Sequence, residues 1–208
     1  RLDDFKIKKE LGKGSFGQVL LAEHLKTKAN YAIKAIDKRI KNNEEGIPYF
    51  RREIEIMNKI KHPNCVRFFG NFEDEKYCYF IMEYASKGNL YDLIQKNKKA
   101  GLDKVLVAKI IRELINTIHY LHSLNPPIIH RDIKPENILL TNENKIKLTD
   151  FGWANYMNDK DEKRNTLCGT PLYLAPEMID NTGHGKPVDI WCIGVLLFEL
   201  LAGFPPFY

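Results

Sequence analysis

The segment from His130 to Asn137, His-Arg-Asp-Ile-Lys-Pro-Glu-Asn, gathers several chemically useful side chains. Asp132 can accept a proton, and Lys134 can neutralise negative charge beside it. Asn137 offers a neutral oxygen, which suits a hard cation such as Mg²⁺. These residue types fit proton abstraction next to an anion and a metal ion. An ordinary polar turn between a helix and a short strand is the alternative interpretation.

A second ligand for a hard cation follows in Asp150, within Thr-Asp-Phe-Gly. Residues 138–140 and 146–148 are predicted to be the strands of a hairpin that joins it to the first segment. Asp150 and Asn137 could therefore hold one Mg²⁺ ion together. Alone, Asp-Phe-Gly is a common turn, so this interpretation depends on the loop and the hairpin before it.

Gly12 to Gly17 has the spacing G-x-G-x-x-G between two predicted strands, 5–11 and 18–24. In the dinucleotide-binding fingerprint the glycines open a helix instead. Glycines in a hairpin let the backbone approach phosphates, because they carry no Cβ. A plain glycine hairpin remains the alternative for this motif taken alone.

Lys34 lies in a predicted strand, 31–37, on the same face as apolar neighbours. Glu53 lies on the apolar stripe of a helix predicted over about 47–60. A buried lysine and a buried glutamate are each costly alone and tolerable as a pair. We therefore predict an ion pair between them. The alternative is a lysine that reaches solvent from the end of its strand.

The remaining elements are predicted from the same periodicities. Two more strands are expected over 66–72 and 77–83, and a connector rich in turn residues follows them. Helices are expected over 89–96, 104–123 and 189–201. The second should face the core with Ala108, Ile111, Ile115 and Ile118. The third is apolar, predicted to be buried, and shorter than the roughly 20 apolar residues that cross a bilayer.

Composition sets broad limits. The chain has 208 residues, of which 44% are hydrophobic, as in folded globular proteins. Its net charge of +5 comes from scattered lysines, so direct nucleic-acid binding is weakly supported. Its four cysteines lack C-x-x-C spacing and indicate reduced thiols in an intracellular protein. The charged start, Arg1 to Asp4, does not resemble a signal peptide.

Together these motifs resemble eukaryotic protein kinases. The loop H-R-D-x-K-x-x-N, the glycine motif followed by Val19, Asp-Phe-Gly and Ala175-Pro176-Glu177 occur in the kinase order. Within the superfamily the chain resembles Aurora kinases, because Trp153 follows Asp-Phe-Gly and 164–170 resembles R-x-T-L-C-G-T. Ala175, where Auroras often have proline, is a departure, as is Pro-Pro before the loop. Cyclic-nucleotide-dependent, calcium/calmodulin-dependent and polo-like kinases are the alternatives.

The resemblance implies an α+β, two-lobed kinase fold. A small β-rich N-lobe, with a five-stranded sheet and one helix, is expected at 1–83, and a hinge at 84–88. A larger, mainly helical C-lobe is expected at 89–208, truncated at its C-terminal end. The resemblance also implies that Asp189 bonds the backbone of the 130–137 loop.

The resemblance further implies ATP and Mg²⁺ as cofactors. Asp132 would be the catalytic base, Lys134 would stabilise the transferred phosphoryl group, and Asn137 and Asp150 would hold the metal. ATP would contact the glycine loop, the Lys34–Glu53 pair, the hinge and a leucine below the adenine. These ATP-binding residues are Leu11, Gly12, Lys13, Gly14, Ser15, Phe16, Gly17, Gln18, Val19, Ala32, Lys34, Glu53, Met82, Glu83, Ala85 and Leu139.

The implied activity is transfer of the γ-phosphoryl group of Mg-ATP to serine or threonine hydroxyls of proteins. Lys134 favours Ser/Thr over Tyr, and Glu136 would face a basic residue upstream of the acceptor. Thr166 would be the activating phosphosite, received by Arg131. Thr170, its rival, is instead expected to contact Asp132 and Lys134.

Protein substrates and a monomeric catalytic domain are expected, without nucleic acid or membrane. An Aurora-like identity implies a mitotic role and an activating spindle or centromere protein on the N-lobe. The expected location is the cytoplasm and nucleus, including spindle, centrosome or centromere. A pseudokinase scaffold is the alternative, but it is disfavoured because Lys34, Asp132 and Asp150 are all present.

Overall fold

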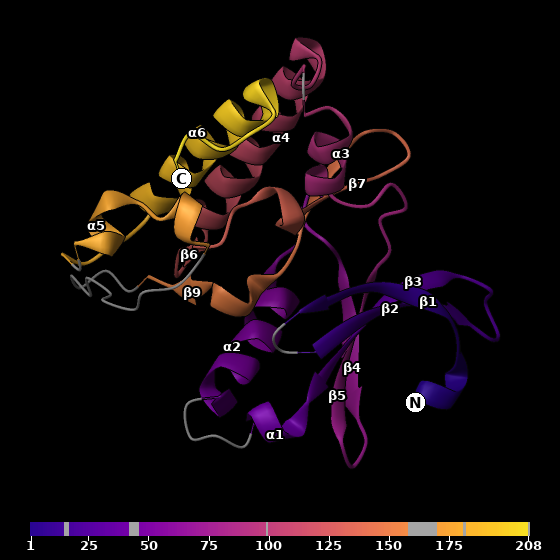
Figure 1. Cartoon of the computed structure of the whole chain (residues 1–208). Helices are drawn as coiled ribbons and strands as arrows, with labels where there is room; N and C mark the ends of the chain where they lie inside the picture. Colours follow the sequence, from indigo (N-terminus) through magenta and orange to yellow (C-terminus); the bar gives the residue numbers. More distant parts are fainter. Residues whose placement is uncertain (15–16, 42–45, 99, 158–169, 181, 208) are drawn as a thin grey trace. The chain divides into compact units, whose positions relative to one another are not determined.

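The computed structural model describes residues 1–14, 17–41, 46–98, 100–157, 170–180 and 182–207 (Figure 1). The chain forms two compact units, each with its own packing. The first comprises Arg1–Lys61 and Val66–Tyr84, and the second comprises His62–Cys65 and Ala85–Tyr208. The division at 83 and 88 that we predicted from the sequence stays a prediction.

The first unit is built on a five-stranded antiparallel sheet of order β1-β2-β3-β5-β4 (Figure 1). Its strands are β1 Phe5–Gly14, β2 Gly17–His24, β3 Asn30–Asp37, β4 Phe68–Glu73 and β5 Tyr77–Glu83. β1 and β2 pair down to Gly14 and Gly17, so the predicted strands extend further toward the glycine turn. The short 3₁₀ turn Leu2–Asp4 precedes β1.

Two helices belong to this unit, α1 Lys38–Lys41 and α2 Gly46–Lys59. The sequence predicted α2, whereas α1 is an additional short helix after β3. The ring of Phe50 in α2 lies 5.1 Å from that of Phe80 in β5. Phe80 is paired with Lys34 in the sheet register. α2 therefore packs on the sheet near the strand that carries Lys34.

The second unit contains the longer helices. They are α3 Leu90–Lys96, α4 Lys104–Ser123, α5 Pro176–Ile179 and α6 Pro187–Ala202. Side chains cap two of them, because Asn89 accepts a hydrogen bond from Asp92 N and Asp103 accepts one from Leu106 N. These caps explain why α3 and α4 begin where they do. None of the described helices has the length and hydropathy needed to cross a bilayer.

Short antiparallel pairs connect the helices of the second unit. β6 Ile128–Ile129 pairs with β9 Asn155–Tyr156, and β7 Ile138–Leu140 pairs with β8 Ile146–Leu148. Three 3₁₀ turns lie between them and after them: η2 Pro135–Asn137, η3 Phe151–Trp153 and η4 Pro171–Tyr173. The predicted hairpin between Asn137 and Asp150 is therefore present.

The core-facing stripe of α4 differs from our prediction. Ile111 and Ile118 are buried, but Ala108 is exposed and Ile115 is 49% exposed. The helix instead buries Val107, Ile110, Ile111, Leu114, Thr117, Ile118 and Leu121. Two adjacent arcs of α4 are apolar, so periodicity alone could not decide which arc faces the core.

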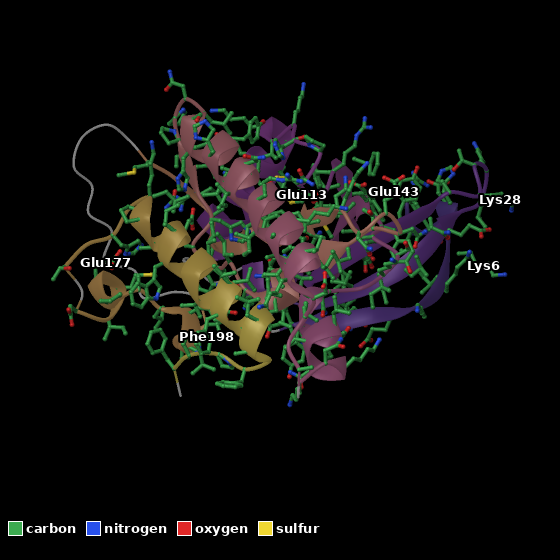
Figure 2. The ribbon with its side chains drawn as sticks, turned by 90° about the horizontal axis from the view of Figure 1, so that it is seen from above. Lys6, Lys28, Glu113, Glu143, Glu177 and Phe198 are labelled. Atoms are coloured by element: carbon green, nitrogen blue, oxygen red, sulfur yellow. The ribbon has the colours of Figure 1, made fainter. Side chains whose placement is uncertain are left out.

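The prediction that α6 is buried is correct for one side only. Val188, Cys192 and Leu196 are buried, whereas Ile190 is 57% exposed and Phe198 43% exposed. Figure 2 shows the side chain of Phe198 on α6. A helix that is apolar all round normally needs covering on every side. Within the described residues, α6 is covered on one side.

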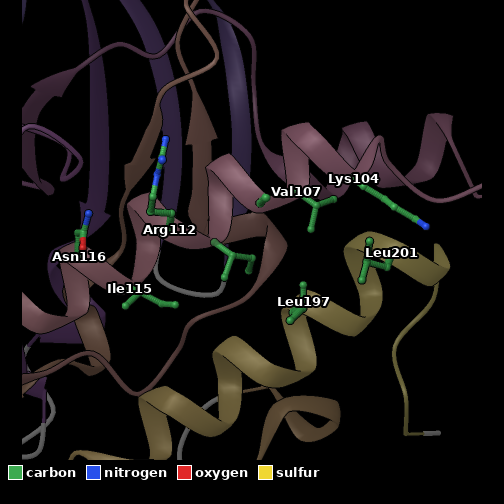
Figure 3. Close-up of a pocket in the computed structure, with 9 residues that line it drawn as sticks. Lys104, Val107, Arg112, Ile115, Asn116, Leu197 and Leu201 are labelled. Atoms are coloured by element: carbon green, nitrogen blue, oxygen red, sulfur yellow. The ribbon is translucent and has the colours of Figure 1, made fainter.

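A pocket of about 520 Å³ lies between α4 and α6 (Figure 3). Leu197 and Leu201 of α6 face Val107 and Ile115 of α4 across it. It accounts for the exposure of Ile115. None of the predicted site residues lines this pocket, so it is separate from the candidate site.

Candidate active site

The loop after β6 is fixed by the buried carboxylate of Asp189, in the first turn of α6. Asp189 Oδ2 accepts a hydrogen bond from His130 N at 3.0 Å, and Oδ1 accepts one from Arg131 N at 2.9 Å. His122 Nε2 lies 2.8 Å from Oδ2. Hydrogen bonds to an ionised carboxylate are stronger than neutral ones. The expected contact between Asp189 and the loop backbone is confirmed.

Asp132 lies next to three donors within this unit. Its Oδ2 is 2.9 Å from Lys134 Nζ and 2.8 Å from Asn137 Nδ2. Its Oδ1 accepts from Thr170 Oγ1 at 3.4 Å, and Lys134 Nζ donates to the same Thr170 hydroxyl at 2.9 Å. The expected contacts of Thr170 are confirmed. The structure thus brings Asp132, Lys134 and Asn137 together, with the Asp132 carboxylate held in one orientation.

His130 supports the loop through both of its ring nitrogens. Nδ1 accepts from Asp132 N at 3.3 Å, so Nε2 carries the proton and donates to Thr149 O at 3.1 Å. The ring also packs edge-on against Phe151, with centroids 5.0 Å apart. His130 thereby links the Asp132 loop to the segment that carries Asp150.

Asn137 and Asp150 lie at the two ends of the β7–β8 hairpin. Asn137 uses its amide nitrogen as a donor to Asp132, which leaves the amide oxygen as its possible metal ligand. Thr149 N donates to Asn137 O at 3.0 Å and draws the ends of the hairpin together. Among the described residues no group of three His, Cys, Asp or Glu could hold a metal. One carboxylate and one amide nevertheless fit Mg²⁺, which usually completes its shell with phosphate oxygens and water.

Two residues of this region have left-handed backbone conformations. Arg131 has a φ of 67° and Asp150 a φ of 61°. Such angles are uncommon for residues other than glycine, and they often occur at functional sites. For Arg131, the hydrogen bonds of its backbone N–H to Asp189 and of its Nε to Trp153 O hold the residue in this conformation.

In the first unit, Lys34 Nζ lies 2.8 Å from Glu53 Oε1. The two side chains are only 15% and 8% exposed. The predicted ion pair is confirmed as a contact. Lys34 is paired with Val19 in the sheet, so the glycine turn and the ion pair share neighbouring strands.

The glycine turn is described on both sides of its tip. Gly12 pairs with Val19, Lys13 with Gln18 and Gly14 with Gly17. Gly17 has a φ of 149°, and a Cβ there would lie 1.9 Å from Ala35 O, so another residue could not replace it without rearrangement. Ser15 and Phe16 lie outside the described residues.

The other predicted ATP-binding residues fall in both units. Ala32 and Met82 are paired neighbours on β3 and β5, and each is 6% exposed. Glu83 N donates to Arg67 O at 2.8 Å, and Leu11 is 39% exposed. Ala85 and Leu139 belong to the second unit, where Ala85 is buried. The predicted phosphosite Thr166 lies outside the described residues.

The protein kinase domain family matches residues 5–208. This chain belongs to that family. The kinase resemblance and the α+β kinase fold predicted from the sequence are thereby confirmed. Membership of the family implies ATP together with a divalent metal.

The kinase domain is also similar to Aurora kinases over nearly its whole length. It is 44% identical to an Aurora kinase of Saccharomyces cerevisiae, covering 99% of this chain and 55% of the relative. It is 43% identical to an Aurora kinase of Schizosaccharomyces pombe, covering 98% and 56%. With Aurora kinase B of Mus musculus the identity is 43%, covering 99% and 58%. The chain thus spans a little over half the length of these relatives.

Sequence reasoning missed a buried acid in the kinase domain. Tyr173 Oη donates to Glu199 Oε2 at 2.5 Å, and both residues are buried. Burial raises the pKa of Glu199 above its usual range, the Tyr173 hydroxyl opposes this, and the nearby Glu136 adds to it. The available signal was Glu199, the one acidic residue in the apolar run from Ile190 to Leu201.

The surroundings of Arg131 were also missed. Arg131 is 3% exposed, its Nε donates to Trp153 O at 2.8 Å, and its Nη1 lies 3.4 Å from His184 Nε2. His184 stands alone between two glycines, far from the loop in sequence, so no local pattern connects it to Arg131.

Proposed function

We propose that this chain is the catalytic part of an ATP-dependent protein serine/threonine kinase. The observation that carries the proposal is the Asp132 carboxylate, held by Lys134, Asn137 and Thr170. A fixed carboxylate of this kind suits a general base for a hydroxyl. The substrate oxygen would form a bond to the γ-phosphorus, the bond to the β-phosphate oxygen would break, and Asp132 would take the hydroxyl proton.

The other residues would bind and orient the nucleotide. Lys34, held by Glu53, would bind the α- and β-phosphates, and the glycine turn would bring backbone N–H groups to them. Asn137 and Asp150 would hold Mg²⁺, which neutralises charge on the β- and γ-phosphates. Lys134, beside Asp132, would stabilise the transferring phosphoryl group. Ala32, Met82, Glu83, Ala85 and Leu139 would contact the adenine.

Two features support the proposed substrate class. Lys134 next to the base is typical of serine/threonine kinases. Glu136 is exposed in η2, where it could attract a basic residue upstream of the acceptor.

Thr166 is proposed as the activating phosphosite, with Arg131 as the receiver of the phosphate. Arg131 directly precedes Asp132, so this contact would link the segment around Thr166 to the catalytic loop. A phosphate adds about −1.5 to −2 charges and three acceptor oxygens, which an arginine can bind in a bidentate manner.

The Aurora relatives support further proposals for the whole protein. These are a mitotic role, an activating spindle or centromere protein on the first unit, and a monomeric catalytic domain. The proposed location is intracellular, in cytoplasm and nucleus, including the spindle, centrosome or centromere.

A degenerate peptide library tests the proposed activity and substrate class together. The full-length protein should phosphorylate serine and threonine peptides in the presence of Mg-ATP, with a preference for arginine or lysine upstream. ATP binding without transfer to any peptide would instead favour the pseudokinase scaffold. A preference for tyrosine peptides would contradict the role given to Lys134.

A further inference from the structure

Two residues close together in the sequence, His184 and Asp189, contact the side chain and the backbone of Arg131. Asp189 accepts a hydrogen bond from Arg131 N, and His184, five residues earlier, contacts the Arg131 guanidinium. The left-handed φ of 67° at Arg131 makes such support necessary, because a non-glycine residue in this region is otherwise disfavoured. The backbone anchor belongs to the site already described, whereas the side-chain anchor has no assigned role.

The contact between Arg131 and His184 is buried, and the chemistry of the two side chains decides which is the donor. Arg131 is 3% exposed and His184 is 6% exposed. A guanidinium has only donors, so His184 must accept through an unprotonated Nε2. His184 is therefore neutral in this arrangement, with its proton on Nδ1. The carbonyl of Trp153 is the second acceptor, at 2.8 Å from Arg131 Nε.

Two glycines, Gly183 and Gly185, flank His184. Gly183 has a φ of 86°, which favours glycine. A Cβ on Gly185 would lie 3.0 Å from Met157 Cε, so the backbone there is close to the segment after Asp150. The backbone next to His184 thus packs closely against the Met157 side chain.

We propose that His184 is a positioning residue for the catalytic loop. By accepting a hydrogen bond from Arg131, it fixes the guanidinium and with it the backbone that carries Asp132. This inference rests on the proposed role of Asp132. Arg131 directly precedes Asp132 in the sequence, and it is not one of the ATP-binding residues of the first unit. We therefore expect His184 to affect phosphoryl transfer and not nucleotide binding.

The test uses the full-length protein and two substitutions. His184→Leu removes both ring nitrogens, and His184→Gln keeps a side-chain acceptor. His119→Leu, at an exposed position of α4, is the matched control. Because His184→Leu removes the acceptor that fixes the Arg131 guanidinium beside Asp132, it should lower kcat by about tenfold or more. KM for ATP should stay within about twofold, and His184→Gln should recover most of kcat.

A second readout does not depend on activity. Hydrogen exchange of the Arg131 Nη–H groups, followed by NMR, should be slow in the wild-type and His184→Gln proteins and faster in His184→Leu. In an Arg131→Met background, His184→Leu should lower kcat by less than about twofold further, because the two residues act as one unit.

Several outcomes would overturn the inference. They are unchanged kcat and unchanged Arg131 exchange in His184→Leu, equal losses in His184→Leu and His184→Gln, or an undiminished loss in the Arg131→Met background. A wild-type protein without any transfer activity would defeat the proposed function. The exchange measurement would still decide whether His184 holds Arg131.

Discussion

Lys34 and Glu53 form a close ion pair, with Nζ and Oε1 2.8 Å apart and both side chains largely buried. One residue comes from β3 and the other from α2, so the pair also links the sheet to its helix. Breaking such a pair leaves a buried charge without its partner, which typically costs about 3–5 kcal/mol. The pair should therefore matter for stability as well as for activity.

A double-mutant cycle tests whether Lys34 and Glu53 act together. Lys34→Met should reduce phosphoryl transfer strongly, and Glu53→Gln should do so more mildly. The double variant should lose less than the product of the two effects, with a coupling energy of about 0.5–3 kcal/mol. Simple additivity of the two losses would contradict a shared role in orienting the phosphates.

Thr166 and Thr170 should respond differently to substitution. Thr166→Ala should remove the activating phosphate and lower activity in protein that is otherwise phosphorylated. Thr170→Ala should lower activity whatever the phosphorylation state, because Thr170 contacts both Asp132 and Lys134. Mass spectrometry of the active enzyme, together with kcat of both variants, separates the two roles. Full activity of unphosphorylated Thr166→Ala protein would exclude the proposed switch.

Glu199 should make stability depend on pH. Because burial raises its pKa in the folded state, the folded protein favours the neutral carboxyl. Its unfavourable contribution is absent below the unfolded pKa and grows as pH rises toward the folded value. Glu199→Gln, which can still accept from Tyr173, should therefore become increasingly stable relative to wild type as pH rises from 4 to 7. Urea unfolding at several pH values measures this, with Glu75→Gln at an exposed position as the control. A constant difference across the range would contradict the burial argument.

The exposed side of α6 should bind hydrophobic dyes. Ile190, Phe198 and Leu201 are 57%, 43% and 43% exposed, which is unusual for a helix of this composition. We expect the isolated 208-residue chain to bind such a dye in its folded state, and Phe198→Lys to reduce the binding. A cooperative, reversible melt without dye binding would show that this face is covered.

The sequence predicted the contacts of charged residues that occur at positions where the local periodicity calls for an apolar side chain. Lys34 and Glu53 could be paired because each lies among apolar neighbours. The catalytic loop could be recognised because its motif is short and its spacing specific. The buried face of α4 was predicted correctly for Ile111 and Ile118 but not for Ala108 and Ile115. Two adjacent arcs of the helix are apolar, and contacts with other elements decide which arc is buried. The contact of Arg131 with His184 spans 53 positions and has no periodicity that could indicate it.

The most direct test of the central claim is the effect of Asp132→Asn in the full-length protein. The substitution keeps the shape of the side chain but removes the group that would accept the hydroxyl proton. ATP affinity should stay close to that of wild type, while kcat should fall by about 10²–10⁴, the range for a positioned general base. Single-turnover phosphorylation of a serine peptide, with nucleotide binding measured in parallel, gives both numbers. A near wild-type kcat in Asp132→Asn would contradict the assignment of Asp132 as the base.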